Sequence, residues 1–374
     1  MMRFLHVADT HLGHTAYTKL DENGYNQREA DIFDAFKQAV DKALALKVDA
    51  VLHAGDLFDS IRPSNRAIHF ALEQILRLSE ADVPFVAIAG NHSSPRLRET
   101  GSVFRLFEHL KNVRVVYAGS YENIELDDVA IHCVPHCATQ DAFAEEVRKV
   151  AVVPGKTNVA MLHCGVSGVE RFAMGEFNEN ILPSGALWPE MEYIALGHFH
   201  DRTIVERNAV YAGSTERMSF NEAGKAKGTV EVSVPKMSMQ FHELSVRPMV
   251  DMGKIDCRAL TNSDIVRAVE ERILASNPSG KILRIKLAGI RRSQSDGLDQ
   301  KRLRSAADEA LHFELRIETL DECAGAQGTQ AAVGDLRTEF ETFLLGTPIE
   351  RLDKAELLRL GRGYIESAME TEGD

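Results

Sequence analysis

Short apolar runs alternate with amphipathic segments along the first ninety residues. Residues 3–8 (RFLHVA) and 48–54 (VDAVLHA) are mainly apolar, as in strands that are buried on both faces. Residues 26–47, between them, carry apolar side chains at helical spacing, which predicts an amphipathic helix. A helix over 65–79 and a strand over 83–89 repeat the pattern. The chain therefore begins as an α/β fold, in which functional residues are expected where the strands end.

From about residue 113 to residue 245, the pattern changes to short β-branched segments such as VRVVYA, NVAMLHC and GTVEVSV. This half is expected to be rich in strands. A single domain that joins both halves would be a sandwich of two sheets with helices on its outer faces, an α-β-β-α arrangement of four layers.

The remainder of the chain is expected to contain three further parts. The main domain would occupy 1–247, and 248–322 would form a small α/β domain that alternates helix and strand. The stretch 323–334 (CAGAQGTQAAVG) has few large apolar residues and is predicted to be a linker. Two amphipathic helices would then make a helical extension over 335–374.

Composition narrows the class of protein. A hydrophobic fraction of 44% and a charged fraction of 26% are typical of a globular protein and exclude a mainly disordered one. No stretch of about 18 apolar residues occurs, so we expect a cytoplasmic protein with no membrane association. Five scattered cysteines without a C-x-x-C argue against a disulfide framework. The net charge of −13 argues against nucleic-acid binding through a general positive field.

Five short signatures carry the candidate chemistry, and each follows a predicted strand. They are Asp9-Thr10-His11, Gly55-Asp56, Gly90-Asn91-His92, His163, and Gly197-His198-Phe199-His200. In D-x-H and H-x-H, an extended chain points both side chains to the same side, so both can reach one metal cluster. Carboxylate, amide and imidazole ligands without thiolate suit Mn, Fe or Zn. One such motif would be weak evidence, but the ordered set is hard to obtain by chance.

This ordered set resembles that of the calcineurin-like metallophosphoesterase superfamily. Within it, HVADTHLG, AGDLFDSIRPS, and ALGHFHDR followed by YAGSTER resemble the DNA double-strand-break repair nucleases of the SbcD type, which pair with an SMC-like coiled-coil ATPase. The resemblance covers residues 1 to about 245. Beyond that point, domain order and length agree but no motif does. The resemblance implies a metallophosphoesterase sandwich with a small capping domain and a C-terminal helical extension.

The resemblance also implies roles for the motif residues. Two divalent metal ions, expected to be Mn²⁺, would share one bridging ligand, Asp56. One ion would be held by Asp9, His11 and His200, and the other by Asn91, His163 and His198. His92 would not be a ligand but would face the scissile phosphate as a general acid or transition-state stabiliser.

Two positions depart from the superfamily pattern. Ser93 stands where many members have an acidic residue after G-N-H, which bears on the orientation of the ligands. Asp59 stands where some members of the nuclease family have a histidine that orients the catalytic histidine. Asp59 is expected to accept a hydrogen bond from His92 and so to fix its tautomer.

Contacts with double-stranded DNA are expected from basic residues near the motifs and in the second domain. A charge run is usually a solvated face, and this alternative stays open. The candidates for DNA contact are His14, Arg62, Arg96, Arg98, Arg291, Arg292 and Arg302.

Partner proteins are also expected from the family resemblance. The resemblance implies that the C-terminal helices bind the SMC-like ABC ATPase. This chain has no G-x-x-x-x-G-K-[ST] motif of its own. The alternative is that these helices fold back on the nuclease domain. The resemblance also implies a homodimer, for which the helix over 65–79 and the segment 103–110 are candidates, and an association with the prokaryotic nucleoid.

Two further patterns are weighed against their structural alternatives. The run from His132 to Cys137 contains two histidines and two cysteines but lacks a second ligand pair, so a core role is favoured over zinc binding. Cys164 is expected to be an inert core residue rather than a nucleophile.

The function expected from the sequence is a two-metal DNA exonuclease and endonuclease subunit that processes double-strand-break ends. Two alternatives remain. One is a phosphoesterase of the same superfamily that acts on phosphoproteins or nucleotides, which would not need the C-terminal extension. The other is a scaffold that tethers DNA ends through a decayed site, which the intact ligand set disfavours.

Overall fold

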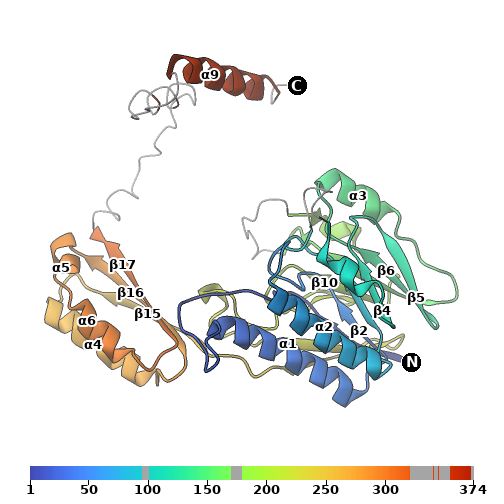
Figure 1. The fold of residues 1–374 in the computed structure, drawn as a ribbon, viewed down its shortest axis with the longest axis horizontal. Coiled ribbons are helices and arrows are strands. Elements are labelled where there is room, and N and C mark those ends of the chain that lie inside the picture. The colour runs from blue at the N-terminus through green and yellow to red at the C-terminus, as the bar shows by residue number, and fades with distance from the viewer. Residues whose placement is uncertain (95–100, 170–178, 321–339, 341–343, 345–353, 372–374) are drawn as a thin grey trace. The chain divides into compact units, whose positions relative to one another are not determined.

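A computed structural model describes residues 1–94, 101–169, 179–320, 340, 344 and 354–371 (Figure 1). Arg96, Arg98 and the predicted linker over 323–334 lie outside the described residues. Among the described residues, no helix is both long and apolar enough to cross a membrane.

Two six-stranded sheets form the main part of the fold. The first has the order β14-β13-β1-β2-β3-β4, and its strands β1, β2, β3 and β4 run parallel. Its strands are β1 (Met2–Val7), β2 (Ala50–His53), β3 (Phe85–Ile88), β4 (Val113–Val116), β13 (Gly228–Val234) and β14 (Ser238–Glu243).

The second sheet has the order β11-β12-β10-β7-β6-β5, with β12, β10, β7 and β6 parallel. Its strands are β5 (Glu122–Leu126), β6 (Val129–Val134), β7 (Thr157–His163), β10 (Tyr193–Gly197), β11 (Thr203–Glu206) and β12 (Ala209–Tyr211). Two short strands, β8 (Gly165–Val166) and β9 (Ile181–Leu182), pair separately.

Three apolar clusters separate the layers of the sandwich. In β1, Leu5 packs toward helices α1 (Gln27–Leu46) and α2 (Asn65–Glu80), while its neighbour Phe4 packs into the core between the sheets. Such alternation is what a strand buried on both faces requires. On the far face of the second sheet, Phe143 of α3 (Gln140–Arg148) joins a third cluster. The predicted sandwich of four layers is confirmed.

A buried polar contact ties the two sheets together beneath the strand ends. His6 Nδ1 of β1 lies 2.8 Å from the hydroxyl of Tyr193 in β10, and both residues are fully buried. Burial lowers the pKa of His6 to about 3, so the imidazole is neutral and the contact is a hydrogen bond between uncharged groups.

The helices begin and end at recognisable residues. The side chain of Asn26 accepts hydrogen bonds from the first turn of α1, and Lys47 ends that helix in the left-handed region with φ 52°. Ser64 accepts from Ala67 N at the start of α2. The short helix α3 was not anticipated from the sequence. Its apolar face contains only one fully buried residue, Phe143, so its periodic signal is weak.

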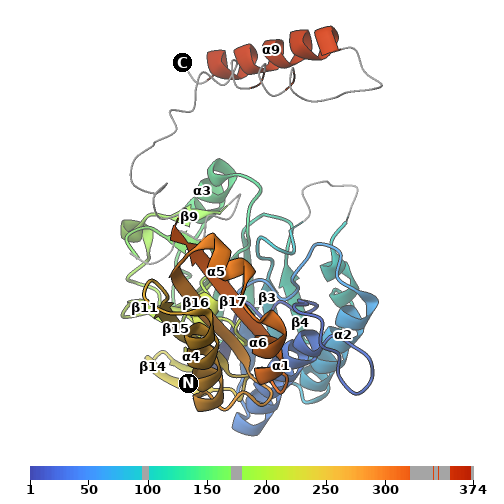
Figure 2. The ribbon, with the colours of Figure 1, turned by 90° about the vertical axis from the view of Figure 1, so that its left-hand side faces the viewer.

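After β14 the chain forms a three-stranded sheet with the order β15-β16-β17. Helices α4 and α6 lie along one face of it (Figures 1 and 2). The elements are β15 (Met249–Asp256), α4 (Asn262–Ala275), β16 (Ile282–Ile290), α5 (Arg292–Asp296), α6 (Gln300–Ala306) and β17 (His312–Thr319). Helix α9 (Lys354–Thr371) is the last element.

Contacts divide the chain into two compact units at other places than the predicted domain boundaries. The first comprises 1–253, 268–285 and 300–315, and the second comprises 254–267, 286–299 and 316–374. Part of the predicted small domain therefore belongs to the same compact unit as the sandwich.

This attachment is specific within the first unit. Arg247 forms a two-pronged ion pair with Asp31 of α1, at 2.5 and 2.6 Å. Tyr17 stacks on His312 with ring centroids 3.8 Å apart, and Lys19 donates to the main-chain oxygen of Ala310.

Candidate metal centre

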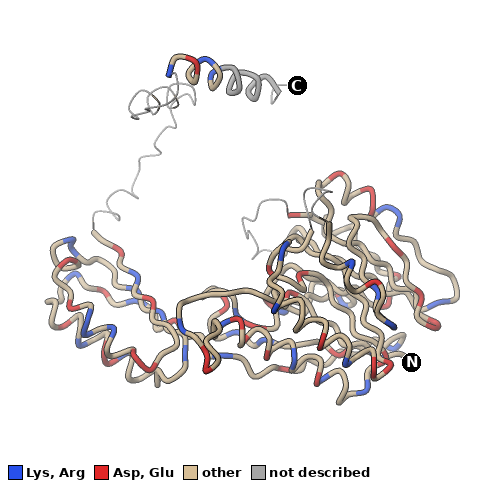
Figure 3. Tube along the Cα trace, viewed as in Figure 1, with Lys and Arg blue, Asp and Glu red and all other residues tan. Residues whose placement is uncertain are grey.

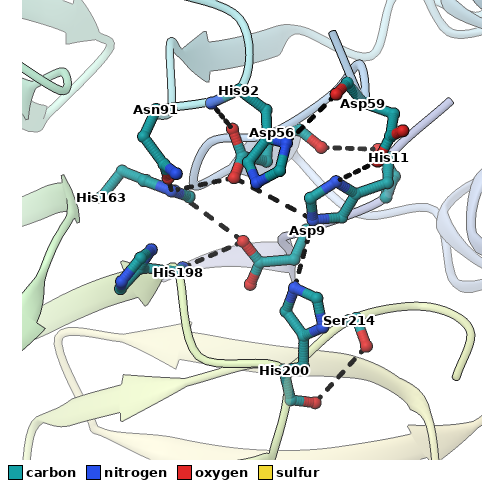
Figure 4. Close-up of polar contacts among 12 residues, drawn as sticks. Asp9, His11, Asp56, Asp59, Asn91, His92, His163, His198, His200 and Ser214 are labelled. Carbon is teal, nitrogen blue, oxygen red and sulfur yellow. Dashed lines mark hydrogen bonds and ion pairs between the residues drawn. The ribbon is translucent and has the colours of Figure 1, made fainter. Parts of the chain in front are cut away.

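Strand register places the five signatures side by side. Val7 pairs with His53 and His53 with Ala87, so β1, β2 and β3 end at the same level. In the other sheet, His163 pairs with Gly197 at the ends of β7 and β10. The seven implied metal ligands and His92 gather at this shared edge of the sandwich (Figure 4).

The backbone at this edge is strained. Asp9, His11 and Asp56 have φ values of 51°, 47° and 50°, a region that residues other than glycine rarely occupy. Hydrogen bonds between the loops hold these conformations, since Asp9 N donates to Gly55 O at 3.1 Å and His11 N to Asp56 O at 3.0 Å. Strain of this kind persists only where the surroundings determine it, and it is concentrated at functional sites.

Two motif glycines allow the side chains to approach closely. A Cβ atom on Gly55 would lie 2.0 Å from His163 Nδ1, and one on Gly90 would lie 2.2 Å from Asp56 Oδ1. Both distances are far below contact distance. These glycines therefore allow ligands from both sheets to pack closely.

We predict that Gly90→Ala displaces the Asp56 carboxylate. The free energy of unfolding should fall by about 1–3 kcal/mol, and affinity for divalent metal should fall with it. Thermal unfolding and calorimetric metal titration measure the two effects. Gly185→Ala is the matched control, because a Cβ at Gly185 meets no atom within 4 Å. Unchanged metal affinity in Gly90→Ala would contradict the packing argument.

Asp56 lies at the centre of the polar contacts. Its Oδ1 accepts from His92 N at 3.0 Å, and its Oδ2 lies 3.1 Å from His163 Nε2. His163 Nε2 is also 2.9 Å from Asn91 Oδ1, while its Nδ1 donates to Ala54 O at 2.9 Å. Contact with His163 holds the pKa of Asp56 well below its usual range, although burial acts in the opposite direction.

Asp9 has an incomplete set of partners. It is fully buried, and its Oδ1 accepts from His198 N at 2.9 Å. Its Oδ2 has no hydrogen-bond partner among the described residues. Burial raises the pKa of Asp9. A buried carboxylate oxygen without a partner is costly, and a cation beside it would remove that cost.

Ligand atoms converge in two groups that suit divalent ions. One contains Asp9, Asp56 and His163, and the other contains His11, Asp56 and His92; within each group the ligand atoms lie within 4.8 Å of one another. Asp56 belongs to both, as a bridging ligand would. His200 Nε2 faces His11 Nε2 at 3.2 Å. Oxygen and imidazole donors together with the unpartnered Asp9 Oδ2 fit a divalent metal centre.

The histidines that would bind metal are held at their outer nitrogens. His11 Nδ1 is 3.1 Å from Asp59 Oδ1, and His200 Nδ1 is 3.1 Å from Glu222 Oε1. His198 Nε2 is 2.5 Å from Glu179 Oε1. Carboxylates in this position fix the tautomer and the ring orientation of a ligand histidine. Sequence reasoning missed Glu179 and Glu222, because neither lies in a motif.

Glu222 belongs to a buried network that explains the YAGSTER segment. It forms an ion pair with the fully buried Lys227, and Lys227 also donates to His200 O at 2.7 Å. Ser214 donates to Glu222 Oε2 at 3.2 Å. With an imidazole and an ammonium group beside it, the pKa of Glu222 falls to about 2 even though burial opposes this. The segment after the last motif therefore holds His200 in place.

His163 is expected to be protonated in the metal-free protein. Burial alone would lower its pKa, but the Asp56 carboxylate outweighs that effect and raises the pKa to about 9. The imidazolium then neutralises Asp56. A metal ion must displace this proton, because only a neutral imidazole binds metal.

This linkage predicts the pH dependence of stability. The folded-state pKa of His163 lies above the unfolded value of 6.5, so its ion pair stabilises the metal-free protein fully below pH 6.5. The contribution is lost as the pH rises through about 9. Thermal unfolding in EDTA should therefore show a decline over this window that excess Mn²⁺ abolishes. The decline should be absent from His163→Gln; its persistence there would assign it to another group.

His92 is oriented by the main chain of Asp59 and not, as the sequence suggested, by its carboxylate. His92 Nδ1 lies 3.1 Å from Asp59 O, while the Asp59 carboxylate contacts His11 Nδ1 and, at 3.3 Å, His14 Nδ1. His92 packs edge-on against His11, with ring centroids 4.8 Å apart. A carbonyl oxygen requires Nδ1–H, so the tautomer of His92 does not depend on the side chain at position 59.

We predict that Asp59→Ala disturbs the orientation of His11 but not that of His92. Metal affinity should fall by about 10–100-fold, because His11 loses the carboxylate that orients it. The pH dependence of hydrolysis should stay unchanged at saturating metal, because the main-chain oxygen at position 59 still orients His92. Asp201→Ala gives a control for loss of one carboxylate in the neighbouring loop. A shifted pH profile in Asp59→Ala would show that the carboxylate also acts on His92.

The structure also places Ser93, the second position that departs from the superfamily pattern, and the candidate residues for DNA contact. Ser93 is buried, and its hydroxyl has no hydrogen-bond partner among the described residues. His14 is held by Asp59 near the centre. Arg62, Arg291 and Arg292 are exposed, whereas Arg302 forms a two-pronged ion pair with Glu270. Figure 3 shows basic residues interspersed with acidic ones along the chain.

The histidine and cysteine run before α3 is part of the core. His132 lies between the Tyr121 hydroxyl at 2.8 Å and Asn158 Oδ1 at 3.0 Å. Burial raises the pKa of Cys137 to about 11 and raises that of Cys164 further. Neither thiol is an activated nucleophile.

The comparisons with known proteins agree with this geometry. The family model for calcineurin-like phosphoesterases matches residues 2–202. The chain belongs to this family, and it is a metal-dependent phosphoesterase.

Relatives with more specific names match a larger part of the chain. A "DNA double-strand break repair protein Mre11" from Sulfolobus acidocaldarius is 26% identical over 84% of this chain and 82% of its own length. Another with that name, from Methanococcus maripaludis, is 31% identical over 59% of each chain, so this chain matches about three fifths of that relative. A solved dimetal phosphatase from Danio rerio is 12% identical with a TM-score of 0.35, covering 66% of this chain and 98% of that one, a likeness too low to carry an argument.

Proposed function

We propose that this chain is a manganese-dependent DNA nuclease that processes double-strand breaks. The observation that carries the proposal is the metal centre with its shared Asp56 and the adjacent His92. Relatives named as double-strand break repair proteins match beyond the phosphoesterase domain, and one from Archaeoglobus fulgidus matches 96% of this chain at 27% identity. This breadth favours DNA over the phosphoprotein or nucleotide substrates of other family members.

We propose the ligand assignment that the family resemblance implies. His11 and His200 face each other through Nε2 and would hold one ion together with Asp9. The second ion would be held by His163, Asn91 and His198, and Asp56 would bridge the two. Bound metal ions would polarise a phosphodiester and generate hydroxide from water at neutral pH. The protein residues supply the orientation of these groups.

His92 is the proposed catalytic residue. Its main-chain nitrogen is fixed by Asp56 Oδ1, and its ring Nδ1 by Asp59 O. Its Nε2 would then face the scissile phosphate, donating a hydrogen bond to the developing charge or a proton to the leaving oxygen.

DNA would be held by local contacts, since the chain carries a net charge of −13. The exposed guanidinium groups of Arg62, Arg291 and Arg292 are the proposed phosphate contacts among the described residues. His14 contacts Asp59, which also contacts the proposed ligand His11. His14 is therefore a further candidate for a phosphate contact.

The parts of the chain outside the metal centre would serve the binding of DNA and of partner proteins. We propose a nuclease domain over 1–247, a capping domain over 248–322, a linker over 323–334 and a helical segment over 335–374 that binds an SMC-like coiled-coil ATPase. Leu360 of α9 is 40% exposed, as a residue at such an interface would be in the free chain. Helix α2 and residues 103–110 are the proposed homodimer contact, with Leu76 and Leu106 exposed at 40% and 53%.

We predict that His92→Asn lowers the rate of Mn²⁺-dependent cleavage of labelled linear duplex and hairpin DNA by about 10²–10⁴-fold. Metal affinity and DNA binding should stay as in the wild type, because His92 is not a proposed ligand. Asp56→Ala is the control that should lose metal and activity together.

Three outcomes would count against the proposal. Loss of metal in His92→Asn would make His92 a ligand. Hydrolysis of nucleotides or phosphopeptides without cleavage of DNA would favour the alternative phosphoesterase. DNA binding by the metal-loaded wild type without cleavage would favour a tethering scaffold.

A further inference from the structure

Two carboxylates outside the sequence motifs support the two histidines of the G-H-x-H signature, and their surroundings differ. Glu222, behind His200, is also paired with the buried ammonium group of Lys227. Glu179, behind His198, has its only ion pair in the described part of the chain with His198 itself, at 2.5 Å between Oε1 and Nε2. Among the described residues, Glu222 therefore pairs with a lysine as well as with a histidine, whereas Glu179 pairs with His198 alone.

The chain next to Glu179 is firmly anchored. Asn180 is buried, and its side chain accepts from Cys137 N at 2.7 Å and donates to Cys137 O at 3.2 Å. Its main-chain oxygen accepts from Gly165 N at 2.9 Å. Ile181 in β9 exchanges two hydrogen bonds with the side chain of Gln140. These contacts fix the backbone from which the Glu179 side chain reaches His198.

His198 is likewise held at several points. Its backbone has φ 105°, and its main-chain nitrogen donates to Asp9 Oδ1. Its ring packs edge-on against His163, with centroids 5.3 Å apart and planes at 71°. Since Nε2 is occupied by Glu179, Nδ1 is the ring nitrogen left to bind a metal.

We propose that Glu179 is a positioning residue for the second metal ion. It accepts the Nε2–H of His198, which fixes the tautomer with a free lone pair on Nδ1, and its negative charge would stabilise a cation bound to that ring. This inference rests on the ligand assignment of the proposed function. It adds that the two ions are supported unequally, one through a carboxylate that also pairs with Lys227 and one through a carboxylate whose only ion pair among the described residues is with His198.

Calorimetric titration of Mn²⁺ into the metal-stripped full chain tests the proposal. In Glu179→Ala, one of two binding steps should weaken by about 10–100-fold while the other stays unchanged. Glu179→Gln should have a smaller effect on the same step, because the amide oxygen still accepts the hydrogen bond but carries no charge. Glu190→Gln, at an exposed position before β10, is the matched control and should bind both ions as the wild type does.

A double-mutant cycle locates the effect. In a His198→Ala background, Glu179→Ala should cause no further loss of affinity, because the residue acts through His198. In a His200→Ala background it should cause the same loss as in the wild type. The melting temperature of the metal-free protein should not change in Glu179→Gln, which separates a positioning role from a merely structural one.

Equal weakening of both steps, a further loss in the His198→Ala background, or no loss in Glu179→Ala would each overturn the proposal. So would a lower melting temperature of metal-free Glu179→Gln without a change in metal affinity. No DNA enters these measurements. A wild type that binds two ions but cleaves no DNA would reject the nuclease proposal and leave the result for Glu179 standing.

Discussion

The contact between Asp56 and His163 is the constraint on which the rest of the structure depends. Asp56 follows a strand of one sheet and His163 ends a strand of the other, and their side chains meet at 3.1 Å in a fully buried position. Such a contact requires the ends of the central strands to share one edge, and it requires the loops between them to have little bulk. The strand register and the glycines at positions 55 and 90 meet both requirements.

The same edge is where the fold is least favourable for stability. Backbones in the left-handed region, a buried carboxylate oxygen without a partner and two adjacent acidic side chains all raise the free energy of the metal-free protein. The surrounding layers offset this with three apolar clusters and the buried hydrogen bond between His6 and Tyr193. The arrangement is what a metal ion would stabilise, so binding and folding are coupled at this site.

Support for the ligands comes from parts of the chain that are distant in sequence. Asp59, Glu179 and Glu222 each hold a different histidine. Glu222 is itself paired with Lys227, and the backbone next to Glu179 is anchored through Asn180. Position 59 shows how a departure from a family pattern can be compensated. His92 is oriented by a main-chain oxygen, which any residue at that position would provide. Ser93 has no such compensation among the described residues, since its buried hydroxyl lacks a partner.

The sequence by itself determined the layered fold and the residues that meet at the site. A strand that is buried on both faces has a distinctive apolar composition, so its position and its end can be read from a short stretch of sequence. The apolar runs that end at Asp9 and at the G-D, G-N-H and G-H-x-H motifs are such stretches. In an α/β sheet, functional residues gather where the strands end. Only the tertiary structure decided which groups support those ligands. Glu179, Glu222 and Lys227 lie in no motif, and their roles depend on the path of loops between strands. Strand β15 and the attachment of Tyr17 to His312 likewise depend on long-range packing, which local periodicity does not encode.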